Sequence, residues 1–116
     1  MTWTIWHNPR CTKSRQTLQL LKDNDIDPAV KLYLKEAPSA DEINAVLTLL
    51  NVEPRDLMRR KEAPFKELNL KNPDLSHESL VAAMANNPVL IERPVVIRDH
   101  SAAAIGRPPE NVLALL

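Results

Sequence analysis

The single cysteine of this chain, Cys11, lies in the segment "HNPRCTKSR" at residues 7–15. A thiolate is a far better nucleophile than a thiol, and nearby positive charge favours the thiolate. The basic neighbours of the cysteine are His7, Arg10, Lys13 and Arg15. The same charges attract oxyanions, so this segment predicts a site that holds a nucleophile and a tetrahedral anion together.

Other uses of the cysteine fit the sequence less well. Free cysteine is often a buried structural residue, but the polar residues on both sides of Cys11 oppose burial and favour an exposed, reactive thiol. In "CTKS" the second position of a Cys-x-x-Cys pair is Ser14, which disfavours a disulfide switch. A cysteine phosphatase loop is also disfavoured, because Arg15 comes too early and the position that needs arginine is Thr17.

The residues around the cysteine form a predicted strand, helix and strand. Residues 2–6 and 29–34 alternate apolar and polar side chains, which is typical of strands. Residues 11–24 are rich in helix formers and place Leu18 and Leu21 on one face. The two strands of such a βαβ unit are parallel. Cys11 then lies at the carboxyl edge of a sheet, where open α/β folds bind ligands, and at the positive end of a helix.

The middle of the chain reads as helical. Ser39 and Ser76 are predicted N-caps of two amphipathic helices, the second of which ends before Pro88. Between them lie short helical pieces that we expect Pro64 to break. Two short strands, "RPVVIRD" and "SAAAIGR", and a closing helix, "PPENVLALL", complete the chain. We therefore expect one α/β domain over residues 1–116, with a helical insertion at roughly 39–87.

Composition excludes several classes of protein. The 116 residues are 44% hydrophobic, enough for one core, and the 15 basic and 15 acidic residues cancel, which argues against nucleic acid and membrane surfaces as partners. We expect no membrane segment, and a lone cysteine indicates the reducing cytoplasm. One glycine, Gly106, cannot build a dinucleotide loop. No cluster of His, Cys, Asp and Glu residues has the spacing of metal ligands, and we expect His77 and His100 at the surface.

Five segments in order resemble the arsenate reductase family of the ArsC type. They are "WHNPRCTKSR", "LYLKEAPS", "LMRRKEAPFKEL", "NPVLIERPVVI" and "IGRPPENVL". The resemblance implies a thioredoxin-like fold (βαβ … ββα) with an inserted helical subdomain. It also implies a cytoplasmic oxidoreductase of arsenic detoxification that reduces arsenate to arsenite. Glutathione is the co-substrate and glutaredoxin the protein partner, and no cofactor or metal is bound.

The resemblance also assigns residues. It implies Cys11 as the nucleophile, with His7 and Ser14 supporting the thiolate by charge and hydrogen bonding. The residues that it implies for the oxyanion are Arg59, with Arg60 as the alternative, Arg93 and Arg107. Guanidinium groups suit this role because they bind oxyanions through two hydrogen bonds. The Arg93–Pro94 bond matches the place of a cis proline in thioredoxin-like folds, and Glu92 is expected to matter little.

Two departures place the chain nearer the short, chromosomal ArsC-like members. Thr12 stands where better-known members have glycine, and no longer tail follows "VLALL". Two other functions therefore stay open. One is a related thiol reductase that acts on another oxyanion or on a glutathionylated substrate. The other is a regulatory module that binds RNA polymerase.

Overall fold

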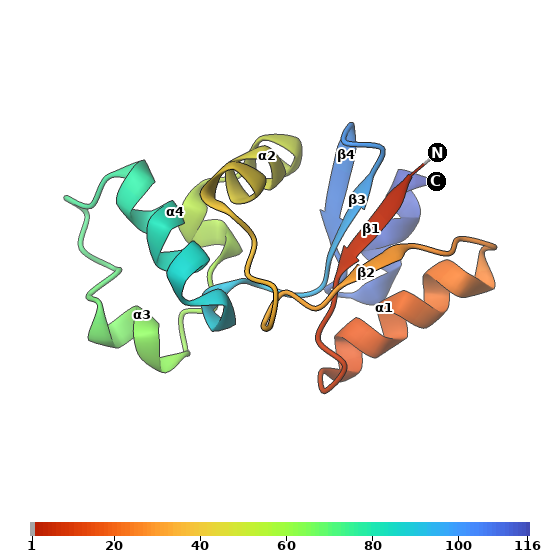
Figure 1. Cartoon of the computed structure of the whole chain (residues 1–116), viewed down its shortest axis with the longest axis horizontal. Helices are drawn as coiled ribbons and strands as arrows, with labels where there is room; N and C mark the ends of the chain where they lie inside the picture. Colours follow the sequence, from red (N-terminus) through yellow and green to blue (C-terminus); the bar gives the residue numbers. More distant parts are fainter. Residues whose placement is uncertain (1) are drawn as a thin grey trace. The chain divides into compact units, whose positions relative to one another are not determined.

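The computed structural model describes residues 2–116, which form two compact units. Unit 1 comprises residues 2–36 and 93–116, and unit 2 comprises Ala37–Glu92. The strands all belong to unit 1, whereas unit 2 is built from helices (Figure 1). The expectation that both belong to one domain, with the insertion at roughly 39–87, stays a prediction.

Unit 1 contains a mixed sheet of four strands in the order β2-β1-β3-β4 (Figure 1). The strands are β1 (Trp3–Trp6), β2 (Ala29–Lys31), β3 (Val95–Arg98) and β4 (Ala102–Ile105). As the sequence predicted, β1 and β2 are parallel, while β3 runs antiparallel to both β1 and β4. The carboxyl ends of β1 and β2 therefore lie at the same edge of the sheet.

Helix α1 (Thr12–Asp23) connects β1 to β2, as predicted. Leu21 is fully buried against the sheet residues Ile5 and Val96, and Leu18 is partly buried against the same core. The closing segment Pro109–Leu115 is a 3₁₀ helix, η3, and it adds Val112 and Leu115 to this core. Burial of these apolar faces anchors the helix that begins beside Cys11.

The second strand is shorter than the predicted strand over residues 29–34. It ends at Lys31 because a turn follows, in which the Lys35 amide donates a hydrogen bond of 2.9 Å to the Leu32 carbonyl. The expected alternation is also wrong at this edge of the sheet: Val30 is 47% exposed and Tyr33 only 1%. An edge strand is covered less completely, so its alternation predicts burial poorly.

Unit 2 contains the predicted helices, which are α2 (Ala40–Leu50), η1 (Pro54–Leu57), α3 (Ala63–Glu67) and α4 (His77–Asn86). It also contains a short 3₁₀ helix that was not predicted, η2 (Pro88–Leu90). The Ser39 hydroxyl accepts from the Glu42 amide and the Glu42 carboxylate accepts from the Ser39 amide, which is the predicted capping box. Ser76 caps α4 through the amide of Ser79.

Pro64 does not break a helix, contrary to expectation. It lies in the first turn of α3, directly after Ala63. The amide that proline lacks has no intrahelical acceptor in a first turn, so proline is tolerated there and its fixed φ favours helix initiation.

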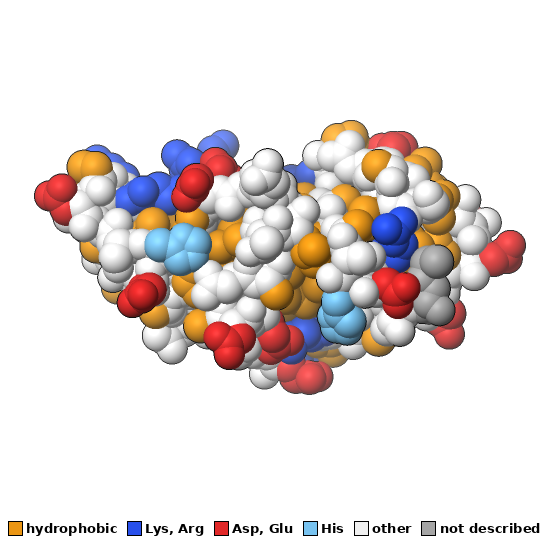
Figure 2. All heavy atoms as spheres, turned by 90° about the horizontal axis from the view of Figure 1, so that it is seen from above, with side chains coloured by type: hydrophobic (Ala, Val, Ile, Leu, Met, Phe, Trp, Pro, Cys, Tyr) orange, Lys and Arg blue, Asp and Glu red, His pale blue; other side chains and the backbone are white. Residues whose placement is uncertain are grey.

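The surface carries both signs of charge. Acidic and basic side chains occur together on the face that Figure 2 draws, in keeping with the 15 residues of each kind. Any electrostatic attraction of a ligand must therefore be local. Within residues 2–116, no helix is long and apolar enough to cross a membrane.

Candidate active site

Cys11 is the N-cap residue of α1. Its backbone is extended, its amide donates to the Asn8 carbonyl at 3.0 Å, and its carbonyl accepts the first helical bond, from Arg15, at 3.0 Å. The side chain makes no capping hydrogen bond. The thiol thus stands at the end of the helix where amides lack helical partners and the helix dipole is positive.

Cys11 is buried, with 8% of its surface exposed. The expectation that polar neighbours keep it exposed is therefore wrong. Those neighbours turn outward instead, since Arg10, Thr12 and Lys13 are all exposed. Because an N-cap residue begins the helix, its backbone is held by hydrogen bonds on both sides while its neighbours remain solvated.

Ser14 links the loop before Cys11 to the helix after it. Its hydroxyl is fully buried, accepts from the Asn8 amide at 3.0 Å and lies 2.6 Å from His7 Nδ1. A serine hydroxyl has one proton to donate and two lone pairs, so it can bond both to the Asn8 amide and to the His7 ring. The hydrogen bond fixes the position of the His7 imidazole beside the loop that carries Cys11.

The surroundings of His7 disfavour the positive charge that the sequence suggested beside the cysteine. Burial lowers the pKa of His7 below its ordinary value of 6.5, and the positive charges of Arg15 and Lys22 lower it further. A neutral imidazole fits the Ser14 hydrogen bond. The support that His7 and Ser14 give to the Cys11 thiolate stays a prediction, now through hydrogen bonding alone.

Arg15 ties the same loop down. Its guanidinium donates to the Pro9 carbonyl at 2.9 Å and to the Thr12 hydroxyl at 3.2 Å. A guanidinium that forms hydrogen bonds at two points restricts the chain around Cys11. This role could not be read from the sequence, where Arg15 counted only as a positive charge.

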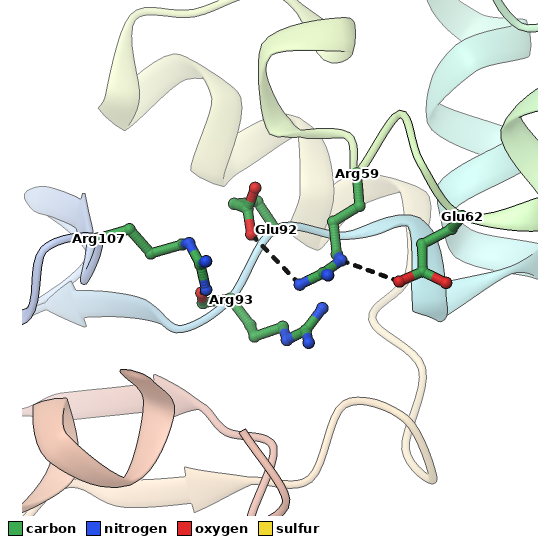
Figure 3. Close-up of polar contacts among 5 residues, drawn as sticks. All are labelled: Arg59, Glu62, Glu92, Arg93 and Arg107. Atoms are coloured by element: carbon green, nitrogen blue, oxygen red, sulfur yellow. Dashed lines mark hydrogen bonds and ion pairs between the residues drawn. The ribbon is translucent and has the colours of Figure 1, made fainter. Parts of the chain in front are cut away.

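Arg93 and Arg107, two of the predicted anion-binding residues, lie next to each other in unit 1. Nη1 of Arg107 lies 3.5 Å from the Arg93 carbonyl, and the two side chains are drawn in Figure 3. Both arginines precede cis proline bonds, at Pro94 and at Pro108. The first cis bond lies where the resemblance to thioredoxin-like folds placed a cis proline. No cis bond was expected at Pro108 from the sequence.

A close contact joins these arginine loops to α1. Gly106 packs so tightly that a Cβ atom there would overlap Thr17 Oγ1 and lie 2.8 Å from Pro94 Cγ. The buried Thr17 donates to the Lys13 carbonyl at 2.8 Å, and the Gly106 amide donates to the Pro94 carbonyl at 2.9 Å. Sequence reasoning missed this contact, although the single glycine stands next to Arg107.

Arg59 belongs to unit 2, where it is held by two carboxylates (Figure 3). Its Nε lies 3.2 Å from Glu62 Oε1, and its Nη1 lies 3.7 Å from Glu92 Oε1. The backbone places these groups together, because the Arg59 amide donates to Leu90 and the Glu92 amide donates to Leu57.

The contacts of Arg59 with two carboxylates were not predicted from the sequence. The three-residue spacing of Glu62 from Arg59 could have suggested that contact. The contact of Glu92 with Arg59 depends on tertiary structure, because a bridge between Met58 and Ile91 brings the two segments together. Glu92 thus contacts a predicted anion-binding residue, while the expectation that its replacement changes activity little stays a prediction. Arg60 is exposed, and its guanidinium lies 3.5 Å from the Arg55 carbonyl.

Comparison with known proteins shows which family this is. The model described as "ArsC family" matches residues 6–115. The chain belongs to the ArsC family. Among its relatives in this family is an arsenate reductase of Haemophilus influenzae, 44% identical over 117 residues, which span 100% of each chain. Another is the uncharacterized protein YfgD of Escherichia coli, 50% identical over 97% of this chain and 94% of the relative.

The ArsC fold is also shared in three dimensions. The solved structure of an arsenate reductase from Vibrio cholerae matches with a TM-score of 0.96 and 48% identity, covering 100% of this chain and 98% of that one. This match confirms the predicted α/β, thioredoxin-like fold.

Unit 1 of this ArsC chain contains groups that suit anion and thiol chemistry. They are a thiol at a helix N-terminus and two guanidinium groups on loops packed against that helix. Such groups suit a nucleophile and a tetrahedral oxyanion. Within residues 2–116, no group of three or more His, Cys, Asp or Glu side chains could hold a metal ion.

Proposed function

We propose that this protein is an arsenate reductase in which Cys11 is the nucleophile. The observation that carries the proposal is the position of the single cysteine at the N-cap of α1, in a chain that matches named arsenate reductases over its full length. Glutathione and glutaredoxin are the proposed reductants, from the family resemblance. A reaction that consumes a thiol also suits the cytoplasm, where thiols stay reduced.

Arg93 and Arg107 are proposed to hold the arsenate. A guanidinium can donate two parallel hydrogen bonds to two oxygens of one oxyanion. Arg59 is proposed as the third member by resemblance, and its two carboxylate neighbours then hold it in place when no anion is bound.

The proposed reaction balances as follows. The Cys11 thiolate attacks arsenic(V), an As–S bond forms, and one arsenate oxygen leaves as water. The thiol of glutathione replaces a second oxygen, which also leaves as water. The two sulfurs then join as both As–S bonds break, so two thiols are oxidised to a Cys11–glutathione disulfide while arsenic(V) takes up two electrons. The released arsenic(III) oxide species takes up one water and becomes arsenite, so the reaction gives off one water overall. Glutaredoxin finally removes the glutathione by thiol–disulfide exchange.

The experiment is a turnover assay. Purified protein is incubated with arsenate, glutathione, glutaredoxin and a glutathione-regenerating system, and arsenite is measured while each component is omitted in turn. We expect arsenite only in the full mixture, and none from the Cys11→Ser variant. A rate unchanged by the Cys11→Ser substitution would overturn the proposal. Turnover of a glutathionylated peptide, with none of arsenate, would instead support the related thiol reductase.

The disulfide intermediate gives a separate prediction. Because the chain has one cysteine, resolution of Cys11 needs an external thiol. When glutaredoxin is withheld, we expect intact-protein mass spectrometry to show a monomer that carries one glutathione after exposure to arsenate and glutathione. Sustained turnover with thioredoxin alone, with no glutathione requirement and no adduct, would contradict this mechanism.

A further inference from the structure

A groove lies beside the segment that leads to Cys11, entirely within unit 1. Its volume is about 370 Å³, which falls in the range of small-molecule sites. Two stretches of chain line it, residues 7–10 and residues 32–35. The lining residues are His7, Asn8, Pro9, Arg10, Leu32, Leu34 and Lys35.

The parallel pairing of β1 and β2 creates this groove. Trp6 is paired with Lys31, and the His7 amide extends the pairing by donating to the Lys31 carbonyl at 2.9 Å. The chain leaves both strands at the same edge of the sheet, so the two loops face each other across the groove. One loop then runs directly into Cys11, whose amide donates to the Asn8 carbonyl at 3.0 Å.

The lining is apolar in part and positively charged in part. Pro9, Leu32 and Leu34 supply the apolar surface, and Leu34 is 43% exposed. Arg10 and Lys35 supply the charge, and no acidic side chain is among the lining residues. Within the described chain, residues 2–116, neither of these two side chains forms a hydrogen bond or an ion pair. Exposed guanidinium and ammonium groups of this kind are available to a carboxylate ligand.

We propose that this groove binds the reducing thiol, a small peptide thiol that carries two carboxylates, of which glutathione is the example. The carboxylates bind Arg10 and Lys35, and the aliphatic part of the peptide contacts Leu32 and Leu34. The thiol then lies beside the loop that carries Cys11. The location rests on the geometry of unit 1, while the identity of the thiol rests on the proposed function.

The chemistry of the groove favours such a thiol over the oxyanion. Arsenate has no apolar surface, so it would leave the leucine side chains without a contact. A ligand with separated carboxylates and a methylene chain matches both kinds of lining. The arginines proposed for arsenate, at positions 93 and 107, are not among the lining residues.

The test uses thiol–disulfide exchange without arsenate. The Cys11 thiolate attacks one sulfur of glutathione disulfide, a new S–S bond joins Cys11 to glutathione, and the second glutathione leaves as a thiolate. The rate of the same exchange reaction is also measured with hydroxyethyl disulfide, which has no carboxylate. The ratio of the two rates cancels any change in the reactivity of Cys11 itself and reports recognition of the charged peptide.

Two charge reversals and one matched control are compared. We expect Arg10→Glu and Lys35→Glu each to lower the rate ratio by about 3- to 10-fold, as the loss of an exposed ion pair and its replacement by repulsion predict. The effect shrinks as salt is added. Lys66→Glu makes the same charge change at an exposed position of α3 that does not line the groove, and it leaves the ratio as in wild type. If the circular dichroism spectrum of a charge-reversal variant differs from that of the wild type, the alanine variant at the same position, Arg10→Ala or Lys35→Ala, is tested in its place.

The outcomes separate this proposal from the proposed function. A selective loss with glutathione disulfide supports the groove even if arsenate is not turned over. Equal losses with both disulfides, or no loss with either, would overturn it. A loss that occurs only in the reaction with glutaredoxin would also overturn it, since the groove would then bind a protein partner.

Discussion

The immediate surroundings of Cys11 combine one helix terminus, one neutral histidine and several exposed cations. His7 is neutral because burial and the nearby Arg15 and Lys22 disfavour its charged form and lower its pKa. Positive charge near the thiol therefore comes from the end of α1 and from basic side chains rather than from an imidazolium. The hydroxyl of Ser14 holds that imidazole in place.

Stability should depend on pH through His7. Since its pKa in the folded protein is below its unfolded value of 6.5, the unfolded chain takes up a proton first as pH falls. The free energy of unfolding is then unaffected by His7 above about pH 6.5 and decreases below it, by at most about 1.4 kcal/mol per pH unit. Urea unfolding at pH 7.5 and pH 5.5 measures this loss.

The control for His7 is the His7→Asn variant, whose side chain does not titrate and can still accept a hydrogen bond from Ser14. Its unfolding free energy should change less between the two pH values than that of the wild type. Equal pH dependence in both proteins would show that His7 does not contribute.

Arg93 and Arg107 should not tolerate lysine. Lysine keeps the charge but cannot donate two parallel hydrogen bonds to one anion. We expect kcat/KM for arsenate to fall about 10-fold or more in each variant, which corresponds to one lost charged hydrogen bond. Urea unfolding midpoints should stay near the wild-type value. Wild-type turnover in both lysine variants would remove these residues from the proposed site.

At the scale of elements, the contact of α1 with the loop around Gly106 is the most sensitive point. A Cβ atom at Gly106 would overlap Thr17 and Pro94, so Gly106→Ala must move the helix or the loop. We expect a loss of about 1–3 kcal/mol in unfolding free energy, the usual cost of overpacking, and a lower arsenate turnover. Denaturant unfolding and the arsenite assay measure the two effects.

A double variant identifies the cause of that loss. Thr17→Ala removes both Thr17 atoms that the new Cβ would approach. The Thr17→Ala, Gly106→Ala protein should therefore be more stable than the sum of the single losses predicts. Additive losses would mean that the overlap with Thr17 is not what destabilises Gly106→Ala.

Local patterns predicted the elements that carry strong local signals. The serine N-caps, the βαβ unit and the hairpin all follow from periodicity and from capping or turn residues. The prediction was wrong where tertiary context decides, as at the short β2 and at Pro64, which begins a helix rather than breaking one. The same holds at the site, because the hydrogen bonds of Ser14 and the carboxylates beside Arg59 join residues from separate segments.

At the scale of the whole molecule, each unit has its own buried side chains. Ile43 is fully buried in unit 2, whereas both tryptophans, Trp3 and Trp6, lie in β1 of unit 1. Tryptophan fluorescence therefore reports on unit 1 alone, and a core substitution in unit 2 can test whether the chain unfolds as one domain.

We expect Ile43→Ala to lower the unfolding free energy by about 2–5 kcal/mol, because it leaves a cavity in a packed core. If residues 1–116 form one domain, the fluorescence transition of unit 1 shifts together with the far-ultraviolet circular dichroism of the helices. A fluorescence midpoint that stays at the wild-type value while the dichroism shifts would contradict the single-domain prediction.

The order of the strands has a consequence for synthesis on the ribosome. β1 is paired with β3, but all of unit 2 lies between them in the chain. During translation β1, α1 and β2 emerge long before β3, so the backbone edge of β1 that receives β3 stays without its hydrogen-bonding partner until unit 2 has been made. An open strand edge beside apolar residues invites pairing with other chains. Early compaction of unit 2, which is continuous in sequence, would shorten the effective distance that β3 must cover to close the sheet.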